Sequence, residues 1–165
     1  MKLDFERFDR IPPSQERFRR ALEARGIHWP EFVGYCASLH SNSIVMAAGS
    51  LVDGTDNRYS DIDLFVLSNG SLPTGQIQIS NLGETRIDVE FRTFAEFNAL
   101  RARLAHSLNL SQRPDNIDFD DLKFFDRILR GLVVFSGAAL PTHPADASLL
   151  ELHLARVRSM KADTV

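Results

Sequence analysis

The sequence has too few cysteines and too little continuous apolar character for several classes of protein. Cys36 is the single cysteine, so no internal disulfide can form, and this favours a reducing, cytoplasmic location. No apolar run approaches the roughly 20 residues of a membrane-spanning helix. The N-terminal residues also lack the apolar stretch of a signal peptide. The sequence therefore predicts a cytoplasmic protein that contacts no membrane.

An excess of positive charge is missing too. Against 19 lysine and arginine residues stand 22 aspartates and glutamates, which leaves a net charge of −3. A protein that binds long nucleic acids through its overall electric field normally has the opposite balance. We therefore expect no long nucleic-acid partner, and any polyanionic ligand must be met by local cations or by metal ions.

The signatures of several enzyme classes do not occur. The five histidines are not spaced as zinc ligands, there is no G-x-S-x-G elbow, and no G-K-[ST] sequence follows Gly49 or Gly54. Cys36 lies on an apolar stripe at helical spacing, a pattern typical of a buried structural thiol rather than a nucleophile. These patterns favour neither a zinc enzyme, nor an elbow-type hydrolase, nor a Walker-type ATPase.

The chain is nevertheless long and apolar enough to fold. Its 165 residues, 44% of them hydrophobic, suit one domain with a substantial core. The order of the predicted elements indicates an α+β fold, a small mixed β-sheet flanked by helices, with extra C-terminal helices. We expect a single domain over residues 1–165, with a core at about 30–110 and a helical region at about 115–165. The last helix runs almost to the end, so a longer natural chain is left open.

Hydrophobic periodicity and turn residues give the expected elements. We predict helices over residues 14–25, 31–40, 94–108, 119–132 and 145–160. We predict strands over residues 43–48, 61–67, 76–80 and 85–92, with a fifth short strand fitting residues 133–135. Residues 51–60 are expected to form a loop, residues 61–67 a central strand, and residues 76–80 an edge strand.

Three acidic residues lie on two of these strands. Asp61 and Asp63 are two residues apart at the start of one strand, so their side chains point the same way, and Asp88 lies inside another strand. Carboxylates brought together repel one another unless cations join them. Mg²⁺ binds one or two carboxylates together with substrate phosphates. A pair of such ions, about 3.5–4 Å apart, stabilises an in-line phosphoryl displacement. The pattern favours a two-metal site.

A glycine and a serine end the apolar strand that precedes these acids. Gly49 allows the backbone to approach a phosphate closely, and the hydroxyl of Ser50 can donate a hydrogen bond to it. Gly49-Ser50, ten residues, Asp61-Ile62-Asp63 and a later acid on a strand together resemble the polymerase-beta-like nucleotidyltransferase superfamily. The segment GSLVDGTDNRYSDIDLFVL is similar to the minimal nucleotidyltransferases and the antibiotic adenylyltransferases. The resemblance extends over residues 44–91.

The resemblance implies a role for each matched residue. Gly49 and Ser50 would hold the β- and γ-phosphates of a nucleotide. Asp61 and Asp63 would bind two Mg²⁺ ions. Asp88 would bind the catalytic ion and help deprotonate an acceptor hydroxyl, which then attacks the α-phosphorus and expels pyrophosphate.

Four further positions qualify this assignment. Ser60 matches the serine that directly precedes the first acid in the family. Asp53 stands where the minimal enzymes often have a basic residue, and Arg58 could supply that charge from elsewhere in the loop. Glu90 shares a strand face with Asp88, so either could be the third metal ligand. We favour Asp88 because the family's acid sits between two apolar strand residues.

The leading hypothesis is therefore a Mg²⁺-dependent nucleotidyltransferase that uses ATP or another nucleoside triphosphate. It would transfer a nucleoside monophosphate, AMP by preference, to a hydroxyl of a small molecule or a protein. One alternative is a non-catalytic module that binds a nucleotide or a protein partner. Another is the catalytic half of a larger two-domain enzyme, and a homodimer or a partner domain could then complete the acceptor side.

Overall fold

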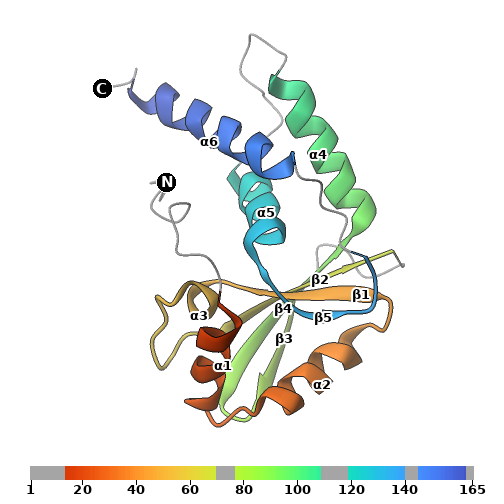
Figure 1. The fold of residues 1–165 in the computed structure, drawn as a ribbon, viewed down its shortest axis with the longest axis vertical. Helices are drawn as coiled ribbons and strands as arrows, with labels where there is room; N and C mark the ends of the chain where they lie inside the picture. Colours follow the sequence, from red (N-terminus) through yellow and green to blue (C-terminus); the bar gives the residue numbers. More distant parts are fainter. Residues whose placement is uncertain (1–13, 70–76, 109–118, 140–144, 163–165) are drawn as a thin grey trace. The chain divides into compact units, whose positions relative to one another are not determined.

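The computed structural model describes residues 14–69, 77–108, 119–139 and 145–162 of the chain (Figure 1). No helix within these ranges is long and apolar enough to cross a bilayer. The helices and strands follow one another as α1 (Gln15–Glu23), α2 (Trp29–Leu39), β1 (Ser43–Ala48), α3 (Ser50–Asp53), β2 (Ile62–Ser68), β3 (Ile77–Leu82), β4 (Thr85–Thr93), α4 (Phe94–Leu108), α5 (Phe119–Arg130), β5 (Leu132–Ser136) and α6 (Asp146–Ala162).

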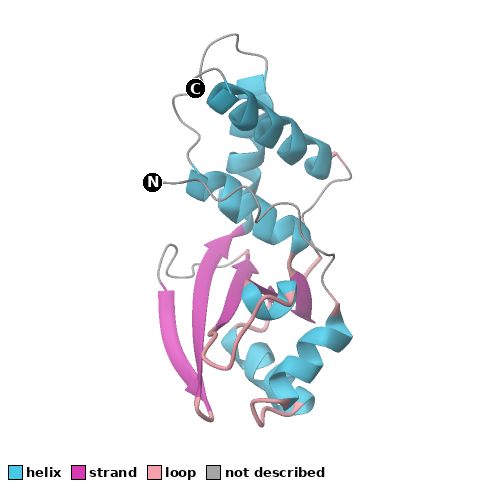
Figure 2. Cartoon of the chain, turned by 90° about the vertical axis from the view of Figure 1, so that its left-hand side faces the viewer, coloured by secondary structure: helices cyan, strands magenta, loops and turns pink. Residues whose placement is uncertain are grey.

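Five strands form one mixed sheet in the order β3-β4-β2-β1-β5 (Figure 2, strands in magenta). The β2 and β4 strands run parallel, whereas the other neighbouring pairs are antiparallel. This confirms the predicted fold class. It also confirms that the strand carrying Asp63 is central and that β3 lies at an edge. The parallel pairing is possible because β3 returns the chain before β4 begins, so that β4 can enter beside β2.

The chain divides into two compact units. The first unit extends to Phe94 and takes in the segment Arg130–Leu140, which contains β5. The second unit comprises Ala95–Leu129 and the chain from Pro141 onward. The predicted helical region began at about residue 115, whereas the second unit begins with α4. The β5 strand belongs to the first unit because it pairs with β1, more than 80 residues earlier in the chain.

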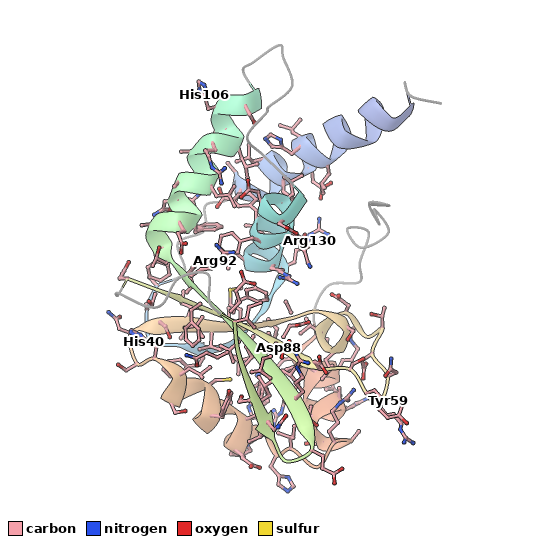
Figure 3. The ribbon with its side chains drawn as sticks, turned by 180° about the vertical axis from the view of Figure 1, so that it is seen from behind. His40, Tyr59, Asp88, Arg92, His106 and Arg130 are labelled. Carbon is pink, nitrogen blue, oxygen red and sulfur yellow. The ribbon has the colours of Figure 1, made fainter. Side chains whose placement is uncertain are left out.

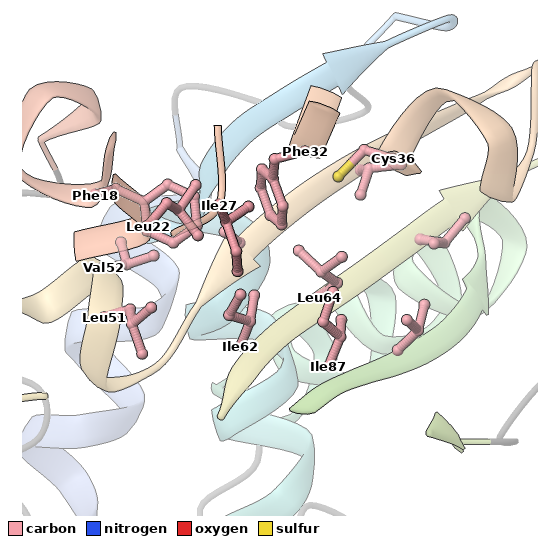
Figure 4. Packing of buried hydrophobic residues seen from close by; sticks show 14 of the residues in the cluster. Phe18, Leu22, Ile27, Phe32, Cys36, Leu51, Val52, Ile62, Leu64 and Ile87 are labelled. Atoms are coloured by element: carbon pink, nitrogen blue, oxygen red, sulfur yellow. The ribbon is translucent and has the colours of Figure 1, made fainter. Parts of the chain in front are cut away.

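The core of the first unit lies between the sheet and helices α1, α2 and α3 (Figure 4). Phe18 and Phe32 are fully buried there, and their rings meet edge to face at 5.5 Å. Burying one such side chain stabilises the fold by about 1.5–3 kcal/mol. Cys36 is also fully buried, and burial raises the pKa of its thiol to about 12. The thiol therefore stays protonated at neutral pH, which agrees with a structural rather than a nucleophilic cysteine.

The helix ends follow from particular residues. Ser14 caps α1, because its hydroxyl oxygen accepts a hydrogen bond from the backbone N–H of Arg17 at 3.3 Å. Gly26 follows that helix with a φ of +73°, a conformation that glycine adopts without strain. The predicted helices over residues 14–25 and 31–40 are confirmed within two residues at each end.

Two element predictions were wrong. Residues 51–53, expected in a loop, form one helical turn together with Ser50. This turn buries the side chains of Leu51 and Val52 in the core. Burial of their apolar surface stabilises the fold, and an exposed loop would lack this contribution. The second error placed Leu132 at the end of a helix. The α5 helix ends at Arg130, and Leu132 opens β5, where it pairs with Ala47 of β1.

The second unit consists of helices packed on one another. Phe97 of α4 stacks on Phe125 of α5, with ring centroids 5.3 Å apart. Arg101 of α4 donates from Nη2 to Oδ2 of Asp146 in α6 at 2.8 Å, and this aspartate is buried. His153 of α6 is buried as well, with Nε2 at 2.8 Å from the carbonyl oxygen of Leu104. Polar contacts thus join the helices in addition to apolar packing.

Candidate active site

Strand register brings the predicted acids to one end of the sheet. Asp63 of β2 lies directly opposite Asp88 of β4 in the parallel pair, and opposite Ala48 of β1 in the antiparallel pair. Residues directly opposite each other in a sheet have side chains on the same face. Asp61 lies one residue before β2 begins, in line with Arg86 of β4. The end of β1, the start of β2 and the first half of β4 therefore meet where the acids are.

Gly49 follows β1 immediately and lies against one of these acids. Its backbone has a φ of +81°, a region that residues with a side chain rarely adopt. A Cβ atom at this position would be 2.1 Å from Oδ2 of Asp63. Two independent constraints therefore require glycine, and the second exists only because the Asp63 carboxylate packs against the turn.

Ser50, the other predicted phosphate-binding residue, is the first residue of the short helix α3. Its backbone oxygen accepts a hydrogen bond from Thr55 at 3.0 Å, which closes the turn. Its hydroxyl forms no hydrogen bond within the described part of the chain. The hydroxyl is thus available to a ligand next to Gly49.

Two arginines of the N-terminal region hold α3 and the loop that links it to β2. Arg17 donates from Nη2 to the carbonyl oxygen of Val52 at 2.5 Å. Arg25 donates from Nη2 to Oδ2 of Asp56 at 2.9 Å and to the carbonyl oxygen of Asn57 at 2.6 Å. Sequence reasoning missed both arginines, because their partners lie more than 30 residues away and no local pattern indicates them.

The remaining predicted residues, Arg58 and Ser60, lie in the last turn of that loop. The Ser60 hydroxyl oxygen accepts a hydrogen bond from the backbone N–H of Asn57 at 3.0 Å. The Arg58 guanidinium lies over the ring of Tyr59, 4.5 Å from its centroid. Figure 3 shows Tyr59 at the outer end of the loop, away from Asp88. Within the described ranges Arg58 forms no ion pair, so its charge is not used by a neighbouring acid.

Arg86, to which the sequence analysis assigned no role, lies among the acids. Its Nε donates to Oδ1 of Asp88 at 2.6 Å, and its Nη2 donates to Oδ2 of the same carboxylate at 2.8 Å. Its Nε is also 3.7 Å from Oδ2 of Asp61. The hydrogen bond and the charge of Asp88 raise the pKa of the Arg86 guanidinium, with smaller contributions from Asp61 and Asp63. Side chains alternate between the two faces of a strand, so Arg86 and Asp88 lie on the same face of β4. This spacing could have indicated their contact from the sequence.

Glu90, the alternative third acid, lies two residues further along β4. It is directly opposite Phe65 rather than an acid of β2. Its Oε1 accepts a hydrogen bond from Nε of Arg92 at 2.9 Å and lies 2.8 Å from Nη2 of the same arginine. Asp88 is therefore the acid of β4 that directly faces Asp63.

The described residues include no group of three or more acidic, histidine or cysteine side chains arranged to hold a metal ion. The donor set nevertheless suits a hard divalent cation, because Asp61, Asp63 and Asp88 offer carboxylate oxygens from neighbouring strands. The guanidinium of Arg86 is already a cation bound by two of these acids. The residues present thus fit Mg²⁺ in chemistry.

The first unit is a mixed α/β domain in which a Gly-Ser turn and acids from two parallel strands meet at one end of the sheet. Residues 30–124 match the family model of the nucleotidyltransferase domain. Since the match covers more than half of the chain, the protein belongs to this family and is a transferase of nucleotidyl groups. The match includes Gly49, Ser50 and the three aspartates, whereas Arg17 and Arg25 precede it. No curated protein sequence matches the chain.

Proposed function

We propose that the protein is a Mg²⁺-dependent nucleotidyltransferase that transfers AMP from ATP to a hydroxyl group and releases pyrophosphate. One observation carries this proposal. The parallel register of β2 and β4 sets Asp88 directly opposite Asp63, beside the turn formed by Gly49 and Ser50. A phosphate-binding turn next to acids on adjacent strands is the arrangement that a metal-assisted attack on a triphosphate requires.

Each residue of the site has a separate task. Asp61 and Asp63 would hold two Mg²⁺ ions, and Asp88 would share in holding one of them. When bound, these ions neutralise the triphosphate and the charge that develops on it during transfer. A carboxylate oxygen of Asp88 accepts the proton of the acceptor hydroxyl, so that this oxygen can attack the α-phosphorus. The phosphorus–oxygen bond to pyrophosphate then breaks.

The Gly49-Ser50 turn binds the leaving group. The backbone of Gly49 lies beside Asp63, whose carboxylate fills the space that a side chain at position 49 would need. The turn at Gly49 and the Ser50 hydroxyl, which has no other hydrogen bond in the described part of the chain, hold the β- and γ-phosphates. Arg58 and Ser60 belong to the nucleotide side of the site. Arg58 supplies the positive charge that the minimal enzymes often have at the position of Asp53. The charge of Arg58 is available for this task, because it forms no ion pair in the described part of the loop.

The acceptor is a small molecule or a protein side chain. The net charge of −3 disfavours a long nucleic acid as acceptor. The acceptor then binds on the side of Asp88, the residue that receives its proton. We assign the reaction to the cytoplasm, on the strength of the single buried cysteine.

The experiment incubates the full chain with labelled ATP, GTP, CTP or UTP, Mg²⁺ and candidate acceptors, and follows pyrophosphate release. We expect release with ATP that requires both Mg²⁺ and an acceptor. The Asp61→Asn and Asp63→Asn variants should lose metal-dependent ATP binding but keep the fold, since less acid repulsion remains. Equal ATP binding with and without Mg²⁺ in all three proteins would instead identify a non-catalytic nucleotide-binding module.

A further inference from the structure

Arg86 binds both carboxylate oxygens of Asp88, the proposed third metal ligand. Its Nε and Nη2 donate to Oδ1 and Oδ2 of Asp88 at 2.6 and 2.8 Å. Such a two-bond pair is the strongest ion pair that a guanidinium forms with a carboxylate. A cation that binds Asp88 therefore competes with an arginine that is already there.

The position of Arg86 also matters to the acids of β2. Its Nε lies 3.7 Å from Oδ2 of Asp61. The negative charges of Asp61 and Asp63 both contribute to raising the pKa of the Arg86 guanidinium. A divalent ion held by the same acids would lie close to this positive charge. The two cations would repel each other, because both are positively charged. Part of the site is exposed to water, but water screens charges only partly at such distances.

A second pair on the same strand provides an internal comparison. Arg92 binds Glu90 over the same spacing of two residues, at 2.8–2.9 Å. Glu90, however, lies opposite Phe65 and not opposite an acid. The two pairs thus share their strand and their spacing, whereas only Asp88 lies opposite an acid of β2. This difference separates a general strand-surface ion pair from one within the site.

We propose that Arg86 is a built-in counter-cation, which neutralises Asp88 in the metal-free protein and competes with divalent metal for this carboxylate. The inference rests on the proposed function, since it takes Asp88 as a metal ligand. In the metal-free protein, Arg86 relieves the repulsion among the three acids. When metal binds, the Arg86–Asp88 hydrogen bonds break, so the apparent metal affinity is lower than the carboxylates alone would provide.

The size of the effect follows from the exposure of the pair. The side chains of Arg86 and Asp88 are 47% and 24% exposed, so the pair is a partly solvated one. Losing the competition of such a pair should change the metal dissociation constant by roughly three- to fivefold. The change should be smaller at high salt, because ions screen the repulsion.

The experiment measures binding of Mn²⁺ alone to the full chain, by the electron paramagnetic resonance signal of the free ion. The proteins compared are the wild type, Arg86→Gln, Arg86→Lys, Arg92→Gln and Asp63→Asn. We expect Arg86→Gln to bind Mn²⁺ about three- to fivefold tighter and Arg92→Gln to bind like the wild type. Arg86→Lys, which keeps the charge but cannot form the two-bond pair, should lie between them. The melting temperature without metal should fall for Arg86→Gln and recover more on adding Mn²⁺.

The outcomes separate this inference from the proposed function. Binding to Arg86→Gln that is equal to or weaker than that of the wild type overturns the inference, and weaker binding would make Arg86 a residue that positions Asp88. An equal gain in Arg86→Gln and Arg92→Gln would also overturn it, because a general charge effect would explain both. If the wild type and Asp63→Asn bind Mn²⁺ alike, the metal site of the proposed function fails, whatever the arginine variants do.

Discussion

Each unit of the molecule contains an arginine–aspartate pair of nearly the same length, in very different surroundings. In the first unit, called the sheet unit below because it contains the five strands, Arg86 and Asp88 lie on the strand surface with two further acids beside them. The second unit is called the helical unit. In the helical unit, Arg101 binds Asp146 at 2.8 Å, and the side chain of this aspartate is only 3% exposed. Distance alone does not distinguish the two pairs.

Burial and neighbouring charge assign the pairs different tasks. A buried carboxylate without its partner is an uncompensated charge, so the Arg101–Asp146 pair is expected to hold α4 and α6 together. A partly exposed carboxylate can exchange its partner for another cation at small cost. The Arg86–Asp88 pair is therefore suited to exchanging the arginine for another cation. The Arg101–Asp146 pair is suited to stabilising the fold.

The largest effect is expected when an acid of the sheet unit is neutralised. Asp88→Asn should lower the rate of nucleotidyl transfer by about 10²–10³-fold, because a metal ligand and proton acceptor is lost. Its melting temperature should change little, since the pair with Arg86 is partly solvated. Glu90→Gln is the matched control on the same face of β4, and it should keep most of the activity. Steady-state pyrophosphate release measures both variants. Normal turnover in Asp88→Asn with loss in Glu90→Gln would show that Glu90 is the third ligand.

In the helical unit the same kind of substitution should affect stability. Asp146→Asn is expected to lower the free energy of unfolding by about 2–3 kcal/mol, less than a fully buried pair because Arg101 is 27% exposed. Urea unfolding followed by circular dichroism measures the change. Asp121→Asn is the control, since its pair with Arg103 is more exposed and its loss should cost less than about 1 kcal/mol. Equal losses in the two variants would show that burial does not decide the strength of these pairs.

A smaller effect should distinguish two glycines of the sheet unit. Gly49 and Gly54 both have positive φ angles, +81° and +75°. Gly54 lies in the left-handed helical region, where alanine should cost about 1–2 kcal/mol of stability. The ψ of −163° places Gly49 in a region that is essentially confined to glycine. Only at Gly49 would the new Cβ meet the Asp63 carboxylate, whereas at Gly54 it would meet the flexible side chain of Arg17. Thermal unfolding should therefore give the larger loss in Gly49→Ala, and transfer activity should fall only in that variant. Similar activity in both variants would count against a tight contact between Gly49 and Asp63.

Much of the fold could be predicted from local patterns. The apolar run over residues 43–48 became β1, which is buried along its whole length, and the alternating run over residues 85–92 became β4. Both succeed because a strand that is buried on one or both faces requires a matching side-chain pattern. The short turn over residues 50–53 escaped prediction, because four residues are too few for a helical period.

The candidate site was predictable in composition but not in contacts. Asp61, Asp63 and Asp88 could be proposed from their places on two strands and from the family resemblance. That Asp63 and Asp88 are direct neighbours depends on the parallel pairing of β2 with β4. Arg25 was beyond prediction, because its partners lie more than 30 residues away and no short-range pattern connects them.

The amino-acid order alone specified most of the residues that form strands and helices, the apolar strand faces, and the positions of the acids and the Gly-Ser turn along the chain. These properties depend on neighbours within a few residues, so periodicity and turn chemistry suffice to predict them. Three contacts arise from the folded arrangement of the whole unit: Arg86 binds Asp88, Gly49 packs against Asp63, and β5 pairs with β1. The reason is physical: strand order, register and side-chain partners are chosen by the packing of the whole unit, which no short segment encodes.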